Sequence, residues 1–543
     1  MNTAFHMRSA AHPNTGSRTP LFAALRRAMG LAAAANAPGA PPVDDLIGLR
    51  YERLTRRQFL QTSAAVAAAA GARTLIGPLG PRVLGAEMRS AARVAIVGGG
   101  IAGLTAAHYL RAGGVRATVY EATTRAGGRM FSVRDAIAPG LVTEFGGEFI
   151  NSDHQDLLAL VKEFGLELMD MKGPGEAGRK DAYFFGGRHY TEVDIVQAFR
   201  PIARRIAADA ARLDERIDFQ HPGGAAGLDR LSLADYLRRI GAVGWIGQLL
   251  DVAYVTEFGL DAGEQSALNF ITLIGTDLSG GFQIVGDSDE RYKVRGGNQQ
   301  IPLALARRLD GRIVYGQRLT ALRARGRALA LTFDQRGTGS TEIVADVVIL
   351  AVPFTMLREV EIGVEMPAIK RKAIRELGYG TNAKLMVGLL ERPWRAAGYS
   401  GSAYSDVGFQ LCWDNSRGQP GPVGGVTLFS GGQSGLLVGQ GTVDEQTARL
   451  VPGADRVFPG VGAARGERGA RWHWPTYPFT KGSYACYRPG QWTGIRGAEA
   501  MRVGNVLFAG EHCSLDYQGY MNGGAETGRK AAETALRLAG ARR

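Results

Sequence analysis

The chain has 543 residues but few cysteines and few histidines. Its three cysteines, Cys412, Cys486 and Cys513, show no C-x-x-C spacing, so the sequence predicts neither a disulfide framework nor a zinc site. The eight histidines are scattered along the chain, which argues against a metal centre. Function therefore has to be sought in other residue types.

Acidic residues are also fewer than basic ones, 51 against 64, and the formal net charge is +13. Residues 1–86 contain ten arginines and three acids, so +7 of that charge lies there. The remainder is only weakly basic, which is not the pattern of a nucleic-acid-binding protein. A composition that is 45% hydrophobic and 21% charged is typical of a soluble globular protein, and the length allows two or three domains.

The N-terminal segment reads as a targeting region. Residues 1–54 show no sustained periodicity and are expected to be disordered. Arg56 and Arg57 then precede the weakly apolar run 64–72, a pattern that resembles a twin-arginine export signal with Gln61 where lysine is more usual. The resemblance implies export through the twin-arginine translocation machinery to the periplasm or the exterior.

Two other interpretations of this segment are a membrane anchor and a chance arginine pair. The run is short and poorly hydrophobic for a membrane span, and Gly77, Pro78 and Pro81 end it. We therefore favour export, with cleavage expected after Ala86. The long stretch ahead of the arginine pair leaves a later start codon open.

The most informative stretch is residues 93–121. A short apolar run at 94–97 is typical of a strand buried on both faces, and G-x-G-x-x-G follows at 98–103 and leads into a helical stretch. A second strand ends in Glu121, 18 residues after Gly103. Strand, glycine loop, helix, strand and acid in this order predict a dinucleotide-binding unit, with Glu121 accepting hydrogen bonds from an adenosine ribose.

Each glycine of the loop has a separate physical role. Gly98 allows a tight turn, Gly100 lets a pyrophosphate approach the backbone, and Gly103 lets the helix pack close to the strand. The phosphates would lie at the helix N-terminus, where free N–H groups and the helix dipole favour anions.

Two further glycine pairs follow the second strand. R-A-G-G-R at residues 125–129 is suited to a second backbone approach to the cofactor, with guanidinium groups near phosphate, and F-G-G-E-F-I spans 145–150. Together with the first motif and Glu121, they resemble the flavin-dependent amine oxidase superfamily of monoamine, polyamine and L-amino acid oxidases. The resemblance covers roughly residues 92–540 and is faint in 170–290.

This resemblance implies non-covalent FAD and a set of cofactor contacts. Some relatives attach flavin through a cysteine at the position of Ser483, which cannot form that bond. Leu319 is expected to approach the adenine, and Glu511 to accept a hydrogen bond from a ribityl hydroxyl. The residues expected to bind FAD are Gly98, Gly100, Ile101, Ala102, Gly103, Glu121, Ala122, Gly128, Arg129, Gly146, Gly147, Glu148, Phe149, Leu319, Gly510, Glu511, Gly519, Tyr520 and Met521.

The fold class is α/β, with a doubly wound, Rossmann-like FAD domain and a mixed α+β substrate domain. We expect the FAD domain to comprise residues 92–150, 290–355 and 500–543, and the substrate domain 151–289 and 356–499. Helical spacing appears at 156–168, 195–219, 233–254, 299–309 and 524–539, and strand patterns appear at 313–333, 342–350, 381–392, 425–432 and 505–512.

Lys384 is the only cation in the apolar run 383–390. A buried ammonium group costs several kcal/mol unless it is hydrogen-bonded or neutralised, so its presence needs a reason. One reason is an edge strand from which the lysine reaches solvent. The resemblance implies another, a lysine that holds a water at the flavin N5, and we favour it.

Three aromatic residues complete the implied site. By the resemblance, Trp474 packs beside the flavin, while Tyr484 and Tyr520 form the two walls of an aromatic cage. Ordinary core packing is the other interpretation of Tyr520 and its neighbour Tyr517. The helix expected after Tyr520 would direct its N-terminal partial charge at the flavin, which stabilises the anionic reduced form.

The implied activity is oxidation of a primary or secondary amine to an imine, which water hydrolyses. The nearest alternative is an L-amino acid oxidase or dehydrogenase, including one for basic amino acids. Such relatives often hold the substrate carboxylate with an arginine near the loop where this chain has Glu148 and Phe149, so we favour a cationic substrate.

Several other points stay open. A flavin-binding protein without a substrate is a further alternative, and Lys384 with the tyrosine pair argues against carotenoid desaturases and porphyrinogen oxidases. The electron acceptor is oxygen, a quinone or another acceptor, and the oligomeric state is open, with a homodimer as one candidate. No nucleic acid partner is expected.

Overall fold

In the computed structural model, the described residues are 31–32, 35–36, 42–43, 92–273, 289–309, 311–335 and 337–540. The twin-arginine motif, the expected cleavage position and most of the segment expected to be disordered lie outside these ranges. A few residues of that segment are described, and there the structure differs from the expectation. Leu31, Ala32 and Ala35 are buried, and the Asn36 side chain donates to the backbone oxygen of Arg200 at 2.7 Å.

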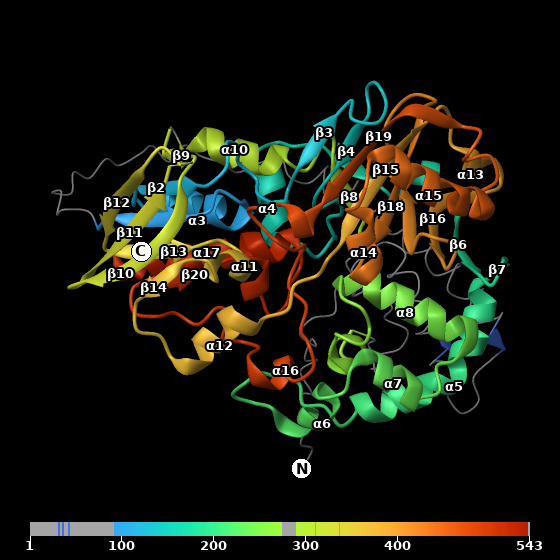
Figure 1. Cartoon of the computed structure of the whole chain (residues 1–543), viewed down its shortest axis with the longest axis horizontal. Helices are drawn as coiled ribbons and strands as arrows, with labels where there is room; N and C mark the ends of the chain where they lie inside the picture. The colour runs from blue at the N-terminus through green and yellow to red at the C-terminus, as the bar shows by residue number, and fades with distance from the viewer. Residues whose placement is uncertain are drawn as a thin grey trace, which may run out of the picture.

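A five-stranded parallel sheet forms the centre of the FAD side of the molecule (Figure 1). Every neighbouring pair in it is parallel, and its strands come from widely separated parts of the chain. In spatial order they are β20 (Val506–Phe508), β13 (Val347–Leu350), β1 (Val94–Val97), β2 (Ala117–Glu121) and β9 (Ile313–Tyr315). The predicted doubly wound α/β fold is confirmed.

Both faces of this sheet are covered. Successive side chains of a strand point to opposite faces, so neighbouring residues of β1 pack in different clusters. Val94 and Ile96 pack in one cluster with residues of α3 (Ile101–Ala112) and α17 (Met521–Leu538). Ala95 and Val97 pack in another, with residues of a four-stranded sheet. That sheet contains, in order, β12 (Ser340–Ala345), β11 (Ala328–Asp334), β10 (Arg318–Arg325) and β14 (Glu361–Gly363).

A seven-stranded mixed sheet forms the substrate side, at the upper right of Figure 1. All seven residues of its strand β15 are buried, which explains the apolar run around Lys384. Lys384 is paired in register with Phe429 on one neighbour and Trp472 on the other. The order is β19 (Arg465–His473), β15 (Ala383–Leu389), β18 (Gly424–Ser430), β17 (Leu411–Asp414), β16 (Tyr399–Ser405), β6 (Lys180–Phe185) and β7 (Arg188–Tyr190).

Helices flank this sheet. α13 (Pro393–Ala396), α14 (Gly432–Val438) and α15 (Val443–Val457) lie beside it, and a helical group lies below it in Figure 1. The group contains α5 (Glu192–Ala210), α6 (Ala226–Asp229), α7 (Leu233–Arg239), α8 (Gly244–Phe258) and α9 (Ala267–Ile271). The helical pattern at 233–254 is two helices, because Gly241 and Gly244 adopt positive φ angles of 75° and 65°.

Short elements join the two sides. β5 (Leu168–Asp170) pairs with β8 (Tyr292–Val294), and β3 (Ser132–Arg134) pairs with β4 (Val142–Glu144). The remaining helices are α4 (Gln155–Glu163), α10 (Gln300–Arg308), α11 (Phe354–Leu357), α12 (Ala368–Glu376) and α16 (Gln491–Gly494), with short 3₁₀ turns at Pro174–Glu176, Gly223–Ala225, Trp474–Thr476 and Glu511–Cys513. No helix among the described residues combines the length and apolar character needed to cross a membrane.

Candidate active site

One cavity collects almost all the residues that the sequence singled out. It is lined by Gly98, Gly100, Ile101, Ala102, Glu121, Ala122, Gly128, Arg129, Gly146, Gly147, Glu148, Phe149, Leu319, Lys384, Trp474, Tyr484, Gly510, Glu511, Gly519, Tyr520 and Met521. Gly103 is the one predicted site residue that does not line it. A Cβ atom on Gly103 would lie 2.0 Å from the carbonyl oxygen of Gly98, so this glycine lets α3 pack against the first loop.

The first glycine loop leaves open space for a ligand. Gly98 has a φ of 108°, and a Cβ there would lie 2.5 Å from the carbonyl oxygen of Ala351. A Cβ on Gly100 would meet nothing closer than the Cα of Gly128, at 3.9 Å. Helix α3 begins directly after Gly100 without a side-chain cap, so its first N–H groups face this space. The arrangement fits the pyrophosphate of a dinucleotide.

Glu121 ends β2 beneath this loop. Its Oε2 accepts a hydrogen bond from the backbone N–H of Gly99 at 2.6 Å, and its Oε1 accepts one from that of Thr123 at 2.8 Å. A carboxylate has about four lone-pair positions, so both oxygens can still accept a ribose hydroxyl. The binding role of Glu121 stays a prediction, and its position is compatible with it.

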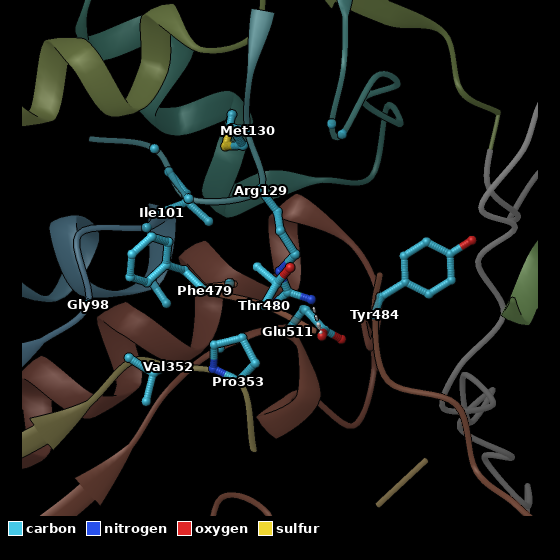
Figure 2. A pocket seen from close by; sticks show the side chains of 18 of the residues that line it. Gly98, Ile101, Arg129, Met130, Val352, Pro353, Phe479, Thr480, Tyr484 and Glu511 are labelled. Atoms are coloured by element: carbon cyan, nitrogen blue, oxygen red, sulfur yellow. Dashed lines mark hydrogen bonds and ion pairs between the residues drawn. The ribbon is translucent and has the colours of Figure 1, made fainter. Parts of the chain in front are cut away.

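An ion pair joins three distant segments at the other end of the cavity (Figure 2). Arg129 donates to Oε1 of Glu511 at 2.8 Å and to the carbonyl oxygen of Ser483 at 2.7 Å. The Oε2 of Glu511 accepts from the backbone N–H of Gly519 at 2.8 Å. The second glycine loop, the Tyr484 segment and the start of α17 are therefore held together by one arginine and one carboxylate.

Lys384 is held by the third glycine loop. Its Nζ donates to the carbonyl oxygens of Glu144 and Gly146 at 3.0 and 2.9 Å and to Oε2 of Glu148 at 2.8 Å, and the side chain is buried. Three acceptors satisfy the three protons of an ammonium group. The interpretation of Lys384 as a lysine that reaches solvent from an edge strand is wrong, because β15 lies between two other strands. A water held at flavin N5 stays a prediction.

Glu148 lies between two buried lysines. Its Oε1 accepts from Nζ of Lys293 at 2.9 Å and from the indole N–H of Trp413 at 2.9 Å, while its Oε2 accepts from Lys384. Burial alone would raise the pKa of Glu148, but the two ammonium groups outweigh it and lower the pKa to about 2. Glu148 is therefore a neutralised anion, and its presence in the sequence is no argument for a cationic substrate.

The aromatic residues surround the same region. Trp474 is buried and lies edge-on to Trp472, with ring centroids 5.5 Å apart. Tyr520 is the N-cap residue of α17, and the hydroxyl of Tyr484 donates to the carbonyl oxygen of Thr256 at 3.1 Å. In Figure 2 the ring of Tyr484 points away from the pair of Arg129 and Glu511. Both tyrosines line the cavity, as the cage hypothesis requires.

Sequence reasoning missed several residues that line this region. Trp413 and Phe429 come from neighbouring strands of the seven-stranded sheet, and Glu290 precedes β8. The Trp413 ring centroid lies 5.9 Å from that of Phe149 and 5.4 Å from that of Phe429. None of the three carries a motif, since a strand residue is assigned to a cavity only when its sheet is in place. Among the described residues no group of metal-ligating side chains could hold an ion.

Comparisons with known proteins agree with this geometry. The sequence matches the family described as flavin containing amine oxidoreductase over residues 101–536. It is 24% identical to an L-amino acid dehydrogenase of Synechocystis sp. (strain ATCC 27184 / PCC 6803 / Kazusa), covering 82% of this chain and 94% of that protein. It is 23% identical to the flavin-containing amine oxidase of Danio rerio, covering 82% and 85%.

Among solved structures, the cyclohexylamine oxidase of Brevibacterium oxydans IH-35A superposes with a TM-score of 0.71 at 22% identity, covering 82% of this chain and 99% of that one. This likeness supports the fold. The family match spans most of the chain and includes the second and third glycine loops, Lys384 and both tyrosines. The chain belongs to the flavin-containing amine oxidoreductases, and it is an FAD-dependent oxidoreductase.

Proposed function

We propose that this protein oxidises the C–N bond of a primary or secondary amine. The carbon bearing a neutral amine would give up a hydride, which FAD would accept when bound. The iminium ion that results, the protonated imine, would react with water to give a carbonyl compound and an amine or ammonia, with release of a proton. The protein's part is to bind and orient the substrate and to shape the electrostatics of the site.

The charges lining the cavity carry this proposal. Four lining residues are cations, and each donates to a protein acceptor: Arg125 to the carbonyl oxygen of Gly128, Arg129 to Glu511, Arg318 to Glu359 and Lys384 to Glu148. A substrate carboxylate would have to compete with these acceptors. An amine has no such requirement, so the cavity favours an amine over an amino acid.

The aromatic rings support the same choice. Aromatic rings form part of the cavity wall, from Tyr484, Tyr520, Trp413 and Phe429. Their apolar faces can desolvate and orient an amine, which needs this more than it needs an ionic partner. The neutral amine is the reactive form, since its lone pair assists loss of the hydride. The two tyrosines are the residues that we expect to flank the reacting carbon.

The test is reduction of the FAD-loaded protein under anaerobic conditions. Reduction is measured as the loss of the yellow flavin absorbance. Primary and secondary amines should bleach the flavin, while matched L-amino acids should not. Bleaching by L-amino acids alone would overturn the choice of substrate class, and no bleaching by any compound of either class would favour a flavin-binding protein without a substrate. Admitting air after reduction, with a peroxide assay, distinguishes oxygen from another electron acceptor.

A further inference from the structure

Glu290 is a buried carboxylate in the wall of the cavity. It precedes strand β8, its side chain lines the cavity, and the residue is only 3% exposed. Its backbone N–H donates to Oδ1 of Asn151 at 3.0 Å, and its φ of 44° lies in the left-handed region. A residue with a Cβ atom adopts that conformation only where the surrounding structure fixes its backbone.

Glu290 differs from every other carboxylate that lines the cavity. Glu121, Glu148, Glu359 and Glu511 each accept hydrogen bonds from protein donors, among them Gly99, Lys384, Arg318 and Arg129 respectively. The Oε2 of Glu290 is buried without a hydrogen-bond partner, and no cation among the described residues forms an ion pair with it. A buried carboxyl group without a donor is costly, which points to a donor that arrives with a ligand.

Nearby charges strengthen the need of the Glu290 carboxylate for a donor. Burial raises the pKa of Glu290 well above its usual value, and the neighbouring carboxylates of Glu257, Asp289 and Glu148 raise it further, while Lys172 opposes them. Burial and these neighbouring carboxylates therefore favour the protonated form of the Glu290 carboxyl group. A ligand cation beside it would reverse that preference by favouring the carboxylate.

The cavity that Glu290 lines also has aromatic walls. Phe149, Trp413 and Phe429 line the same cavity, and the indole of Trp413 also bonds to Glu148, which holds Lys384. Aromatic faces accommodate an alkyl chain and attract a cation that lies against them. The cavity therefore combines aromatic walls with a carboxyl group whose Oε2 has no hydrogen-bond partner.

We propose that Glu290 binds a second cationic group of the substrate, so that the preferred substrate is a diamine or another amine with a distal cation. One amine reacts beside Tyr484 and Tyr520, and the other pairs with the Glu290 carboxylate. This inference rests on the proposed amine oxidation, which it narrows to a class of amines.

The experiment compares substrates that differ only in the distal charge. FAD-loaded wild type is assayed with straight-chain α,ω-diamines of three to six carbons and with the monoamines of equal length, and L-lysine is compared with L-norleucine. We expect kcat/KM for the best diamine to exceed that of its monoamine by roughly tenfold or more. Glu290→Gln should lower this ratio towards one, because the amide keeps the shape and removes the charge.

Glu257→Gln is the matched control. Glu257 is also fully buried but does not line the cavity. Its charge raises the pKa of Glu290, so removing it favours the Glu290 carboxylate, and Glu257→Gln should keep the diamine preference or increase it. Should Glu290→Gln not fold with FAD, the wild-type ratio and Glu290→Asp decide the question, since a shorter carboxylate should shift the preference towards longer diamines.

Equal kcat/KM for diamines and monoamines in the wild type would overturn the inference and leave the proposed function intact. So would a Glu290→Gln variant that keeps the diamine preference. If only the amino acids react and L-lysine is preferred through Glu290, the proposed amine function falls while the contact between Glu290 and a distal cation stands.

Discussion

Replacing Lys384 with methionine separates a structural role from a chemical one. The substitution keeps length and apolar packing but removes three hydrogen bonds of 2.8 to 3.0 Å from a side chain that is only 5% exposed. Losing one partner of a buried ion pair costs about 3–5 kcal/mol, and Glu148 retains Lys293, so we expect the lower end, a loss of about 3 kcal/mol in unfolding free energy. The third glycine loop should loosen, yet FAD should remain bound.

The same substitution should slow turnover with amines by roughly tenfold or more, which corresponds to at least about 1.4 kcal/mol of barrier. Its matched control is Lys293→Met. Lys293 is equally buried and pairs with the same carboxylate, but it does not line the cavity. We expect a comparable loss of stability from Lys293→Met, measured by denaturant unfolding, without the tenfold loss of rate.

Rapid-reaction absorbance then distinguishes flavin reduction from reoxidation. Should both variants reduce and reoxidise their flavin at wild-type rates, Lys384 is a packing residue and its assignment to the active site is wrong. Should both be slowed equally, the effect passes through Glu148 and the glycine loop rather than through the position of Lys384 at the cavity.

Three further predictions address pH, the flavin and export. Burial, opposed by Lys293 and by hydrogen bonds, raises the pKa of Glu144 to about 7, so the folded state binds its proton more tightly than the unfolded state. The difference in unfolding free energy between the wild type and Glu144→Gln should favour the wild type most below pH 4.5. It should fall by up to about 3 kcal/mol as the pH rises through 7. A difference that does not change with pH contradicts this prediction. Because Ser483 cannot form a thioether, acid precipitation should leave the flavin in the supernatant, and yellow pellets after washing in denaturant would count against it. Changing Arg56 and Arg57 to lysine should retain FAD-loaded protein in the cytoplasm, and unchanged export would refute the signal.

The parts of the site that could be predicted from the sequence are those with local physical requirements. Gly98 and Gly103 must be glycines because a Cβ at either position would meet a carbonyl oxygen, and this need appears directly as a motif. Lys384 is recognisable in the sequence as an ammonium group in an apolar strand. The expectation that nearby groups offset its burial is confirmed.

What the sequence could not supply were contacts between distant segments. Nothing local to Lys293 indicates that it pairs with Glu148, which lies 145 residues away. The sequence alone therefore presents Glu148 as an acid that disfavours a substrate carboxylate, whereas in the structure two lysines neutralise it. Glu290 was overlooked because its significance depends on the absence of a partner, which only the assembled cavity reveals.

The parallel sheet has a consequence for the order in which the molecule can be made. Its edge strand β20 and the helix α17 that packs on α3 come from residues 506–538, the last described elements of the chain. During synthesis the first glycine loop therefore waits for residues 506–538 before its sheet and helical cover are complete. Long-range pairings of this kind form slowly. Chaperones that bind nascent chains would meet this protein with the unit of β1, α3 and β2 still open, and the cofactor can be enclosed only after helix α17 has been translated.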